Sequence, residues 1–167
     1  MSDPHAPVTL ADGGPADIDA VDAIMQAAFD PRYGEAWTRA QCLGMLSLPG
    51  VWLTIARDAA GARGFALTRA IAGDAELLLL AVRPESRGRG IGRALLRAAV
   101  DGAMQRGAEQ ICLEMRANND ATRLYQREAF RKRGERRQYY AGNTGERFDA
   151  HTYVRSLCRT EFQKSGE

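Results

Sequence analysis

The chain has 167 residues with a formal net charge of +2, 45% hydrophobic residues and 26% charged residues. This length allows one hydrophobic core and is too short for two ordinary domains. The composition is ordinary for a globular protein, and no apolar run approaches the ~18 residues of a membrane span. We therefore expect a single domain over residues 1–158 and a polar tail over residues 159–167.

The three cysteines, Cys42, Cys112 and Cys158, are odd in number and widely spaced among apolar neighbours. This pattern argues against a disulfide framework and against a metal site, and it favours a reducing compartment. The first dozen residues also lack the apolar segment of a secretion signal. We expect a cytoplasmic protein without a bound metal or a membrane anchor.

Apolar periodicity and turn residues divide the chain into helices and strands. No element is assigned before the break at Gly13-Gly14-Pro15. Helices are predicted over residues 18–29, 38–48, 91–106 and 119–128. Strands are predicted over residues 51–57, 64–71, 76–82, 110–115, 134–140 and 148–157, with a further strand segment from Phe130 onward. An antiparallel meander followed by a strand–helix–strand unit predicts an α/β domain with a mixed, mostly antiparallel central sheet and helices on both faces.

The segment from Leu79 to Leu96 runs from an apolar strand through a basic, glycine-alternating loop directly into an amphipathic helix. The first backbone N–H groups of a helix have no intrahelical acceptor and lie at the positive end of its dipole, where an anion binds. Glycines let the loop backbone curl around phosphate oxygens, and arginines add charge-assisted donors. These features predict a pyrophosphate site made of Arg87, Gly88, Arg89, Gly90, Ile91, Gly92 and Arg93.

An arginine-rich turn that merely begins a helix is the alternative interpretation of this loop. Two other phosphate loops are excluded by spacing, because the loop has no Gly-Lys-Ser/Thr ending and its glycines alternate as GxGxG, not as GxGxxG. The run from Arg87 to Gly92, after a strand that ends in Ala81-Val82, resembles the acetyl-coenzyme A (acetyl-CoA) pyrophosphate loop of the GNAT N-acetyltransferases. The resemblance implies acetyl-CoA as co-substrate, with its pantetheine arm paired to the backbone of Leu80, Ala81 and Val82 as an added strand.

Acetyl transfer to an amine needs a proton acceptor for the amine and a proton donor for the departing thiolate. Glu114, near the end of the strand after the loop helix, can accept the amine proton. Tyr125, on the next helix, can donate to the thiolate. The alternatives are a solvated strand-end glutamate and a core tyrosine bonded to backbone.

The run from Leu113 to Tyr125, followed by Phe130 and by the segment Arg136–Tyr140, is similar to one branch of the superfamily, the bacterial ribosomal-protein-alanine N-acetyltransferases. The resemblance implies that Glu114 is the proton acceptor, Tyr125 the proton donor, and an asparagine the pantetheine contact. The spacing from Glu114 to Tyr125 is one residue shorter than in that branch. Alignment from the strand therefore selects Asn119 and alignment from the tyrosine selects Asn118. We favour Asn119 because the sheet fixes strand register.

A second departure is Ala129, which stands where that branch has a glycine before Phe130. The resemblance also places four aromatic residues at the walls of a peptide groove. They are Tyr33, Trp37, Tyr139 and Tyr140. The alternative is that Trp37 is a hydrophobic staple and that Tyr139 and Tyr140 are ordinary strand aromatics.

Residues 123–137 hold seven basic and two acidic side chains, which invites a nucleic-acid interpretation. The charges fall at irregular spacing over a helix, a turn and a strand, so we expect a solvated face and no direct nucleic-acid contact. The predicted function is direct acetyl transfer to a protein N-terminal α-amine, with a ribosomal protein that begins with alanine as the implied partner. An acidic segment over residues 1–36 suits a basic target. Two alternatives stay open: acetylation of a lysine or small amine, and a non-catalytic coenzyme-binding module.

Overall fold

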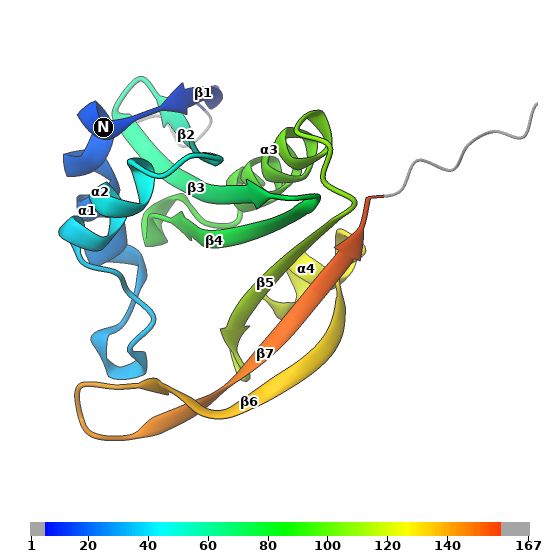
Figure 1. The fold of residues 1–167 in the computed structure, drawn as a ribbon. Coiled ribbons are helices and arrows are strands. Elements are labelled where there is room, and N and C mark those ends of the chain that lie inside the picture. The colour runs from blue at the N-terminus through cyan, green and yellow to red at the C-terminus, as the bar shows by residue number, and fades with distance from the viewer. Residues whose placement is uncertain (1–5, 158–167) are drawn as a thin grey trace, which may run out of the picture.

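The computed structural model describes residues 6–157 (Figure 1). The strands are β1 (Thr9–Gly13), β2 (Val51–Asp58), β3 (Gly61–Ile71), β4 (Asp74–Val82), β5 (Gln110–Arg116), β6 (Arg131–Ala141) and β7 (Arg147–Ser156). The helices are α1 (Ile18–Ala28), α2 (Arg39–Leu46), α3 (Ile91–Gln105) and α4 (Thr122–Arg127), with the 3-10 turns η1 (Pro15–Asp17), η2 (Pro31–Tyr33) and η3 (Pro84–Ser86). Cys158 and the predicted tail over residues 159–167 lie outside the described residues, so the predicted domain boundary stays a prediction.

The strands form one seven-stranded sheet in the order β1-β2-β3-β4-β5-β7-β6. Every neighbouring pair is antiparallel except β4 and β5, which are parallel and joined through α3. One buried cluster joins α1 and α2 to the sheet, and a second joins α3 and α4 to the opposite face (Figure 1). The predicted fold class, a mixed and mostly antiparallel sheet with helices on both faces, is confirmed.

Strands β4 and β5 separate soon after they begin. Their pairing covers only Asp74–Glu76 against Gln110–Cys112, after which the two strands diverge toward their C-terminal ends (Figure 1). The backbone groups of β4 beyond Glu76 therefore have no partner on the β5 side. A wedge-shaped opening between two strands of one sheet is where another extended chain can add its own hydrogen bonds.

A β-bulge in β4 sets which side chains line this opening. The register with β3 moves from Leu67 opposite Leu79 to Thr68 opposite Leu77, which leaves Leu78 without a partner. As a result, Leu77 packs on the α3 side of the sheet, whereas Leu79 packs on the α1 side. The bulge thus changes the face to which β4 directs its side chains just before the strand reaches the phosphate loop.

The structure departs from the prediction at one strand and at one helix start. Sequence analysis assigns nothing before Gly13, yet β1 pairs antiparallel with β2 at the edge of the sheet, as a short exposed strand that carries no alternation signal. The helix predicted over residues 119–128 begins only at Thr122, because the side chain of Asn119 accepts a hydrogen bond from the backbone N–H of Ala121 and holds a turn there. The capping box of Thr38 and Gln41 at the start of α2 is formed as predicted.

Within the described range 6–157, no helix is long and apolar enough to cross a membrane. Cys42 is buried and Cys112 is half-buried, and both are free thiols. Cys158 belongs to the part of the chain that is not described.

Candidate active site

A groove of about 1410 Å³ opens where β4 and β5 diverge. One wall is the C-terminal half of β4, and the facing wall is the end of β5 with α4. The start of α3 closes one end, and the loop after α1 closes the other. The groove brings together Tyr33, Trp37, Leu80, Ala81, Val82, Arg87, Gly88, Gly90, Ile91, Gly92, Arg93, Glu114, Asn119, Tyr125, Tyr139 and Tyr140. Every predicted site residue except Arg89 therefore lines one cavity.

The phosphate loop has the backbone conformation that its glycines predict. Gly88 and Gly90 have φ angles of +76° and +77°, in the left-handed region that side-chained residues resist. Gly90 is the N-cap of α3, and no side chain caps this helix start. The first-turn N–H groups of α3 therefore have no side-chain cap and are free to bind an anion, whose binding stays a prediction.

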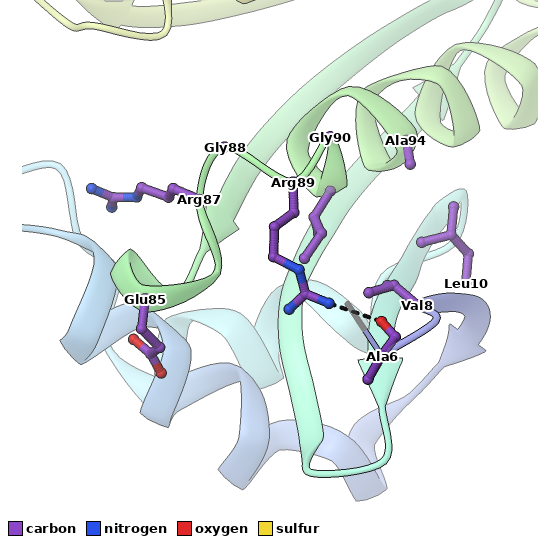
Figure 2. Close-up of a pocket in the computed structure, with 10 residues that line it drawn as sticks. Ala6, Val8, Leu10, Glu85, Arg87, Gly88, Arg89, Gly90 and Ala94 are labelled. Atoms are coloured by element: carbon purple, nitrogen blue, oxygen red, sulfur yellow. Dashed lines mark hydrogen bonds between the residues drawn. The ribbon is translucent and has the colours of Figure 1, made fainter. Parts of the chain in front are cut away.

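Arg87 and Arg89 extend from the loop in different directions (Figure 2). The guanidinium of Arg87 donates to the backbone oxygens of Val82 and Ala28, at 3.3 and 3.0 Å, and so ties the end of β4 to the end of α1. Arg89 donates to the backbone oxygen of Ala6 at 2.9 Å and lies 3.6 Å from the carboxylate of Asp58. Arg89 lines a second cavity of about 680 Å³ on the other side of the loop, so its side chain holds the N-terminal segment, not the groove.

Glu114 lies on β5 with its side chain in the groove and only 20% exposed. One of its carboxylate oxygens, Oε1, is 3.0 Å from Nε of Arg136 and accepts a hydrogen bond from Thr152 Oγ1 at 3.4 Å. These contacts orient the carboxylate from the neighbouring strands β6 and β7. The residue is therefore held in place and is not the freely solvated strand-end glutamate of the alternative interpretation.

Tyr125 lies on α4, is 7% exposed and packs edge-on against Phe130 with ring centroids 5.9 Å apart. Burial, and secondly the negative charge of Glu35, raise the pKa of the Tyr125 phenol above its ordinary value. The phenol consequently keeps its proton throughout the neutral range, which a proton donor in the groove requires.

Glu35, on the loop between η2 and α2, is a groove residue that sequence analysis did not single out. Its side chain is 10% exposed, its Oε2 lies 3.5 Å from Nε of Arg116, and its Oε1 accepts a hydrogen bond from Asn119 at 3.2 Å. The Arg116 guanidinium also stacks over the ring of Tyr33 at 3.7 Å. No local signal separates Glu35 from the other acidic residues of the N-terminal segment, because its partners are more than 80 positions away.

Asn119 lines the groove, whereas Asn118 is exposed and does not. Both polar atoms of the Asn119 side chain are engaged within the protein, one with Glu35 and one with the backbone of Ala121. The choice of Asn119 over Asn118 as the groove residue therefore agrees with the structure. Its contact with pantetheine stays a prediction.

The loop over residues 30–37 and the β6–β7 hairpin tip over residues 141–148 meet and form an arch (Figure 1). Residues of both segments line the groove. A Cβ atom on Gly34 would overlap the backbone oxygen of Ala141, which shows how closely the two segments approach. The Tyr33 and Phe148 rings pack edge-on at 5.1 Å, and Arg32 lies 3.4 Å from Glu146.

The predicted aromatic walls lie beside this arch. A β-bulge between Arg136 and Tyr140 is held by a hydrogen bond from the backbone N–H of Gln138 to Asp149, and Gln138 has a φ of +52°. The bulge directs Tyr139 and Tyr140 together, with ring centroids 5.1 Å apart. Burial, followed by the charges of Glu35 and Glu114, raises the pKa of Tyr140.

Comparison with known proteins agrees with this geometry. Residues 50–132 match the family of the acetyltransferase (GNAT) domain. The [ribosomal protein bS18]-alanine N-acetyltransferase of Escherichia coli K12 is 38% identical over 82 residues, which are 48% of this chain and 55% of that protein. The mycothiol acetyltransferase of Clavibacter sepedonicus is 38% identical over 104 residues, which are 61% of this chain and 31% of that protein.

Solved structures extend the likeness over nearly the whole chain. The E. coli ribosomal-protein-S18-alanine N-acetyltransferase superposes with a TM-score of 0.81 at 26% identity, over 94% of this chain and 98% of that one. The Arabidopsis thaliana NAA60 structure in complex with acetyl-CoA has a TM-score of 0.78 at 20% identity, over 90% of this chain and 99% of that one, and shows the same fold.

The chain belongs to the GNAT acetyltransferases, as the phosphate loop and the fold predict. Acetyl-CoA is the coenzyme of this family, and the predicted co-substrate agrees with it. The aligned segments span about half or less of the length of the curated relatives.

Proposed function

We propose that this protein transfers the acetyl group of acetyl-CoA directly to the free α-amine of a protein N-terminus, and that its acceptor is a ribosomal protein beginning with alanine. One observation carries the proposal. Glu114 and Tyr125 line the same groove, between a helix start that suits a diphosphate and the arch. The E. coli relative, named for acetylation of an alanine of ribosomal protein bS18, suggests the acceptor.

Coenzyme binding follows from the unpaired edge of β4. The diphosphate takes the N–H groups at the start of α3, and the pantetheine amides pair with the backbone of Leu80, Ala81 and Val82 as an added strand. This arrangement directs the thioester along the groove toward β5. The carboxylate of Glu114 and the phenol of Tyr125 then face the reacting atoms from β5 and α4.

The chemistry needs no covalent intermediate on the protein. The neutral amine nitrogen attacks the thioester carbonyl, a C–N bond forms, and the amine proton passes to Glu114, directly or through a water. The C–S bond then breaks, and the leaving sulfur takes the proton of Tyr125. An α-amino group has a pKa near ~8, compared with ~10.4 for lysine, so a useful fraction of an N-terminal amine is already neutral at pH 7.

The arch favours an acceptor that enters by its end. Its two segments meet at Gly34 and Ala141 in the lining of the groove, which disfavours a polypeptide whose chain continues on both sides of the reacting amine. A free N-terminus has chain on one side only and fits this approach.

The test uses three substrates with acetyl-CoA, and free thiol is measured as the product. The first is a peptide that begins with alanine and also contains an internal lysine, the second is the same peptide with an acetylated N-terminus, and the third is a small primary amine. The proposal expects thiol release with the first alone. Equal release with the blocked peptide would refute N-terminal specificity.

A small amine is the second candidate acceptor, because the mycothiol acetyltransferase of C. sepedonicus is also similar to this chain. Release with the small amine alone would establish that candidate, and release with none would leave a coenzyme-binding module. Mass spectrometry of protein N-termini in cells with and without this protein would then name the acceptor. The cytoplasmic location and the lack of nucleic-acid contact stay predictions.

A further inference from the structure

Glu128 is a buried carboxylate that neither the predicted site nor the proposed mechanism uses. It follows the last residue of α4 and is 6% exposed. Its two oxygens accept hydrogen bonds from two arginines of α3, Arg93 Nε at 2.7 Å and Arg97 Nε at 3.0 Å. Its backbone oxygen accepts a third, from Arg155 at 3.0 Å. Isolated burial of a carboxylate is costly, and the two guanidiniums compensate the charge of Glu128.

The two arginines have a different environment from the carboxylate that holds them. The side chains of Arg93 and Arg97 are 57% and 55% exposed, one helical turn apart on α3. Each contacts Glu128 through Nε, which leaves its terminal nitrogens on the outer side of the guanidinium. The hydrogen bonds from Arg97 and Arg93 hold the pKa of Glu128 below its ordinary value, against the opposing effect of burial.

The cluster of Arg93, Arg97 and Glu128 carries a net positive charge, because one carboxylate faces two guanidiniums. Arg93, Arg127 and Glu128 line the same groove as the glycines of the phosphate loop, and Arg97 lies one turn further along α3. Paired arginines with fixed orientation and outward N–H groups are suited to phosphate oxygens. The arrangement stands next to the helix start that already favours an anion.

We propose that Glu128 is a positioning residue that holds Arg97 beside Arg93, a member of the predicted pyrophosphate site, and that the arginine pair takes a phosphate group of the coenzyme. The inference rests on the coenzyme part of the proposed function and not on its acceptor. Coenzyme A offers two sources of this chemistry, the diphosphate and the ribose 3′-phosphate. Because Glu128 ends α4, the contact also links coenzyme binding to the helix that carries Tyr125.

The direction in which Glu128→Gln changes the affinity for coenzyme A distinguishes a positioning role from a simple effect of charge. Glu128→Gln removes a negative charge near the ligand, so electrostatics alone would tighten the binding of an anion. A positioning role predicts the opposite, because the two guanidiniums lose their common acceptor. We expect Glu128→Gln to weaken coenzyme A binding about tenfold, as the loss of one ordered arginine–phosphate contact would do. The KM for acetyl-CoA should rise by a similar factor while kcat stays within about twofold of the wild type.

Calorimetry with coenzyme A and with 3′-dephospho-coenzyme A tests the proposal on the full chain. If the site takes the 3′-phosphate, the loss caused by Glu128→Gln disappears with the dephospho ligand. If it takes the diphosphate, both ligands lose affinity equally. Either result supports the site and identifies which phosphate group of the coenzyme it binds.

Glu85→Gln is the matched control, because Glu85 is an exposed carboxylate of η3 whose removal changes charge near the loop without touching the arginine pair. It should bind coenzyme A as tightly as the wild type or slightly more tightly. If Glu128→Gln does not fold, Arg97→Gln replaces it, since Arg97 is largely exposed and its substitution leaves the helix intact. Arg97→Gln should also weaken coenzyme A binding about tenfold.

Affinity equal to or tighter than the wild type, in folded Glu128→Gln or in Arg97→Gln, would overturn the proposal. Coenzyme binding needs no acceptor, so a wrong acceptor assignment would appear in the peptide assay alone and leave these titrations unchanged. A wild type that does not bind coenzyme A would overturn both the site and the coenzyme assignment.

Discussion

Ala129 ends α4 in a conformation that favours glycine. Its φ is +65°, in the left-handed region. The backbone N–H of Phe130 donates to the Tyr125 oxygen, and that of Ala129 donates to the Gln126 oxygen. These two bonds define a Schellman cap with an alanine at its left-handed position. The packing of Phe130 on Tyr125, which accompanies this cap, connects it to the proposed proton donor.

Ala129→Gly should therefore stabilise the protein. An L-residue in the left-handed region costs about 1–2 kcal/mol, and glycine loses about 0.5–1 kcal/mol more backbone entropy on folding. The methyl group of Ala129 is exposed, so its removal leaves no cavity. The net gain should be about 1 kcal/mol, which for a chain of this size raises Tm by roughly 2–4 °C.

Ala23→Gly provides the control, because Ala23 is an exposed residue inside α1, where the same chemical change is unfavourable. It should lower stability by about 1 kcal/mol. Thermal unfolding at pH 7 and urea titration measure both variants, and the m-value should not change. If Ala129→Gly lowers Tm, or shifts it in the same direction as Ala23→Gly, the reasoning from the backbone conformation is wrong.

Three further predictions concern the groove. Replacing Glu114 by Gln and Tyr125 by Phe should each lower kcat, by about 10²- to 10⁴-fold for the glutamate, with coenzyme affinity nearly unchanged; unchanged turnover in both would remove the assignment. The value of kcat/KM for an N-terminal peptide should rise with pH through about 8, because the amine then loses its proton. At higher pH, up to about pH 10, kcat/KM should show no decrease, because the raised pKa of Tyr125 keeps the donor protonated. A fall near pH 9 that Tyr125→Phe abolishes would contradict this. Gly34→Ala should raise the KM for the peptide and lower stability by at least about 1–2 kcal/mol, since Gly34 has a φ of +66° and no room for a Cβ atom. Gly44→Ala, in an open position of α2, should instead be stabilising by about 0.5–1 kcal/mol and leave KM unchanged.

The conformation of the glycine loop and of the helix start could be predicted from sequence because its signals are local, whereas the roles of Glu114 and Tyr125 stay predictions. The strand, the glycine loop and the helix start lie within one continuous segment, and the helix dipole and glycine conformations depend on neighbouring residues only. The same is true of the capping box at Thr38, which the structure contains as predicted. The roles predicted for Glu114 and Tyr125 came from the resemblance of the short run between Leu113 and Tyr125 to a known family.

The direction of Arg89, the partners of Glu35 and Glu128, and the arch were decided by tertiary structure. Arg89 bonds to Ala6 across 83 positions, Glu35 bonds to Asn119 across 84, and Arg32 bonds to Glu146 across 114. Arginine and glutamate are residue types that are usually exposed, so nothing near these positions in the sequence indicates the partner of each side chain. Short-range preferences choose the helices, strands and turns, whereas the sheet order brings distant charges together and gives each its partner and its burial.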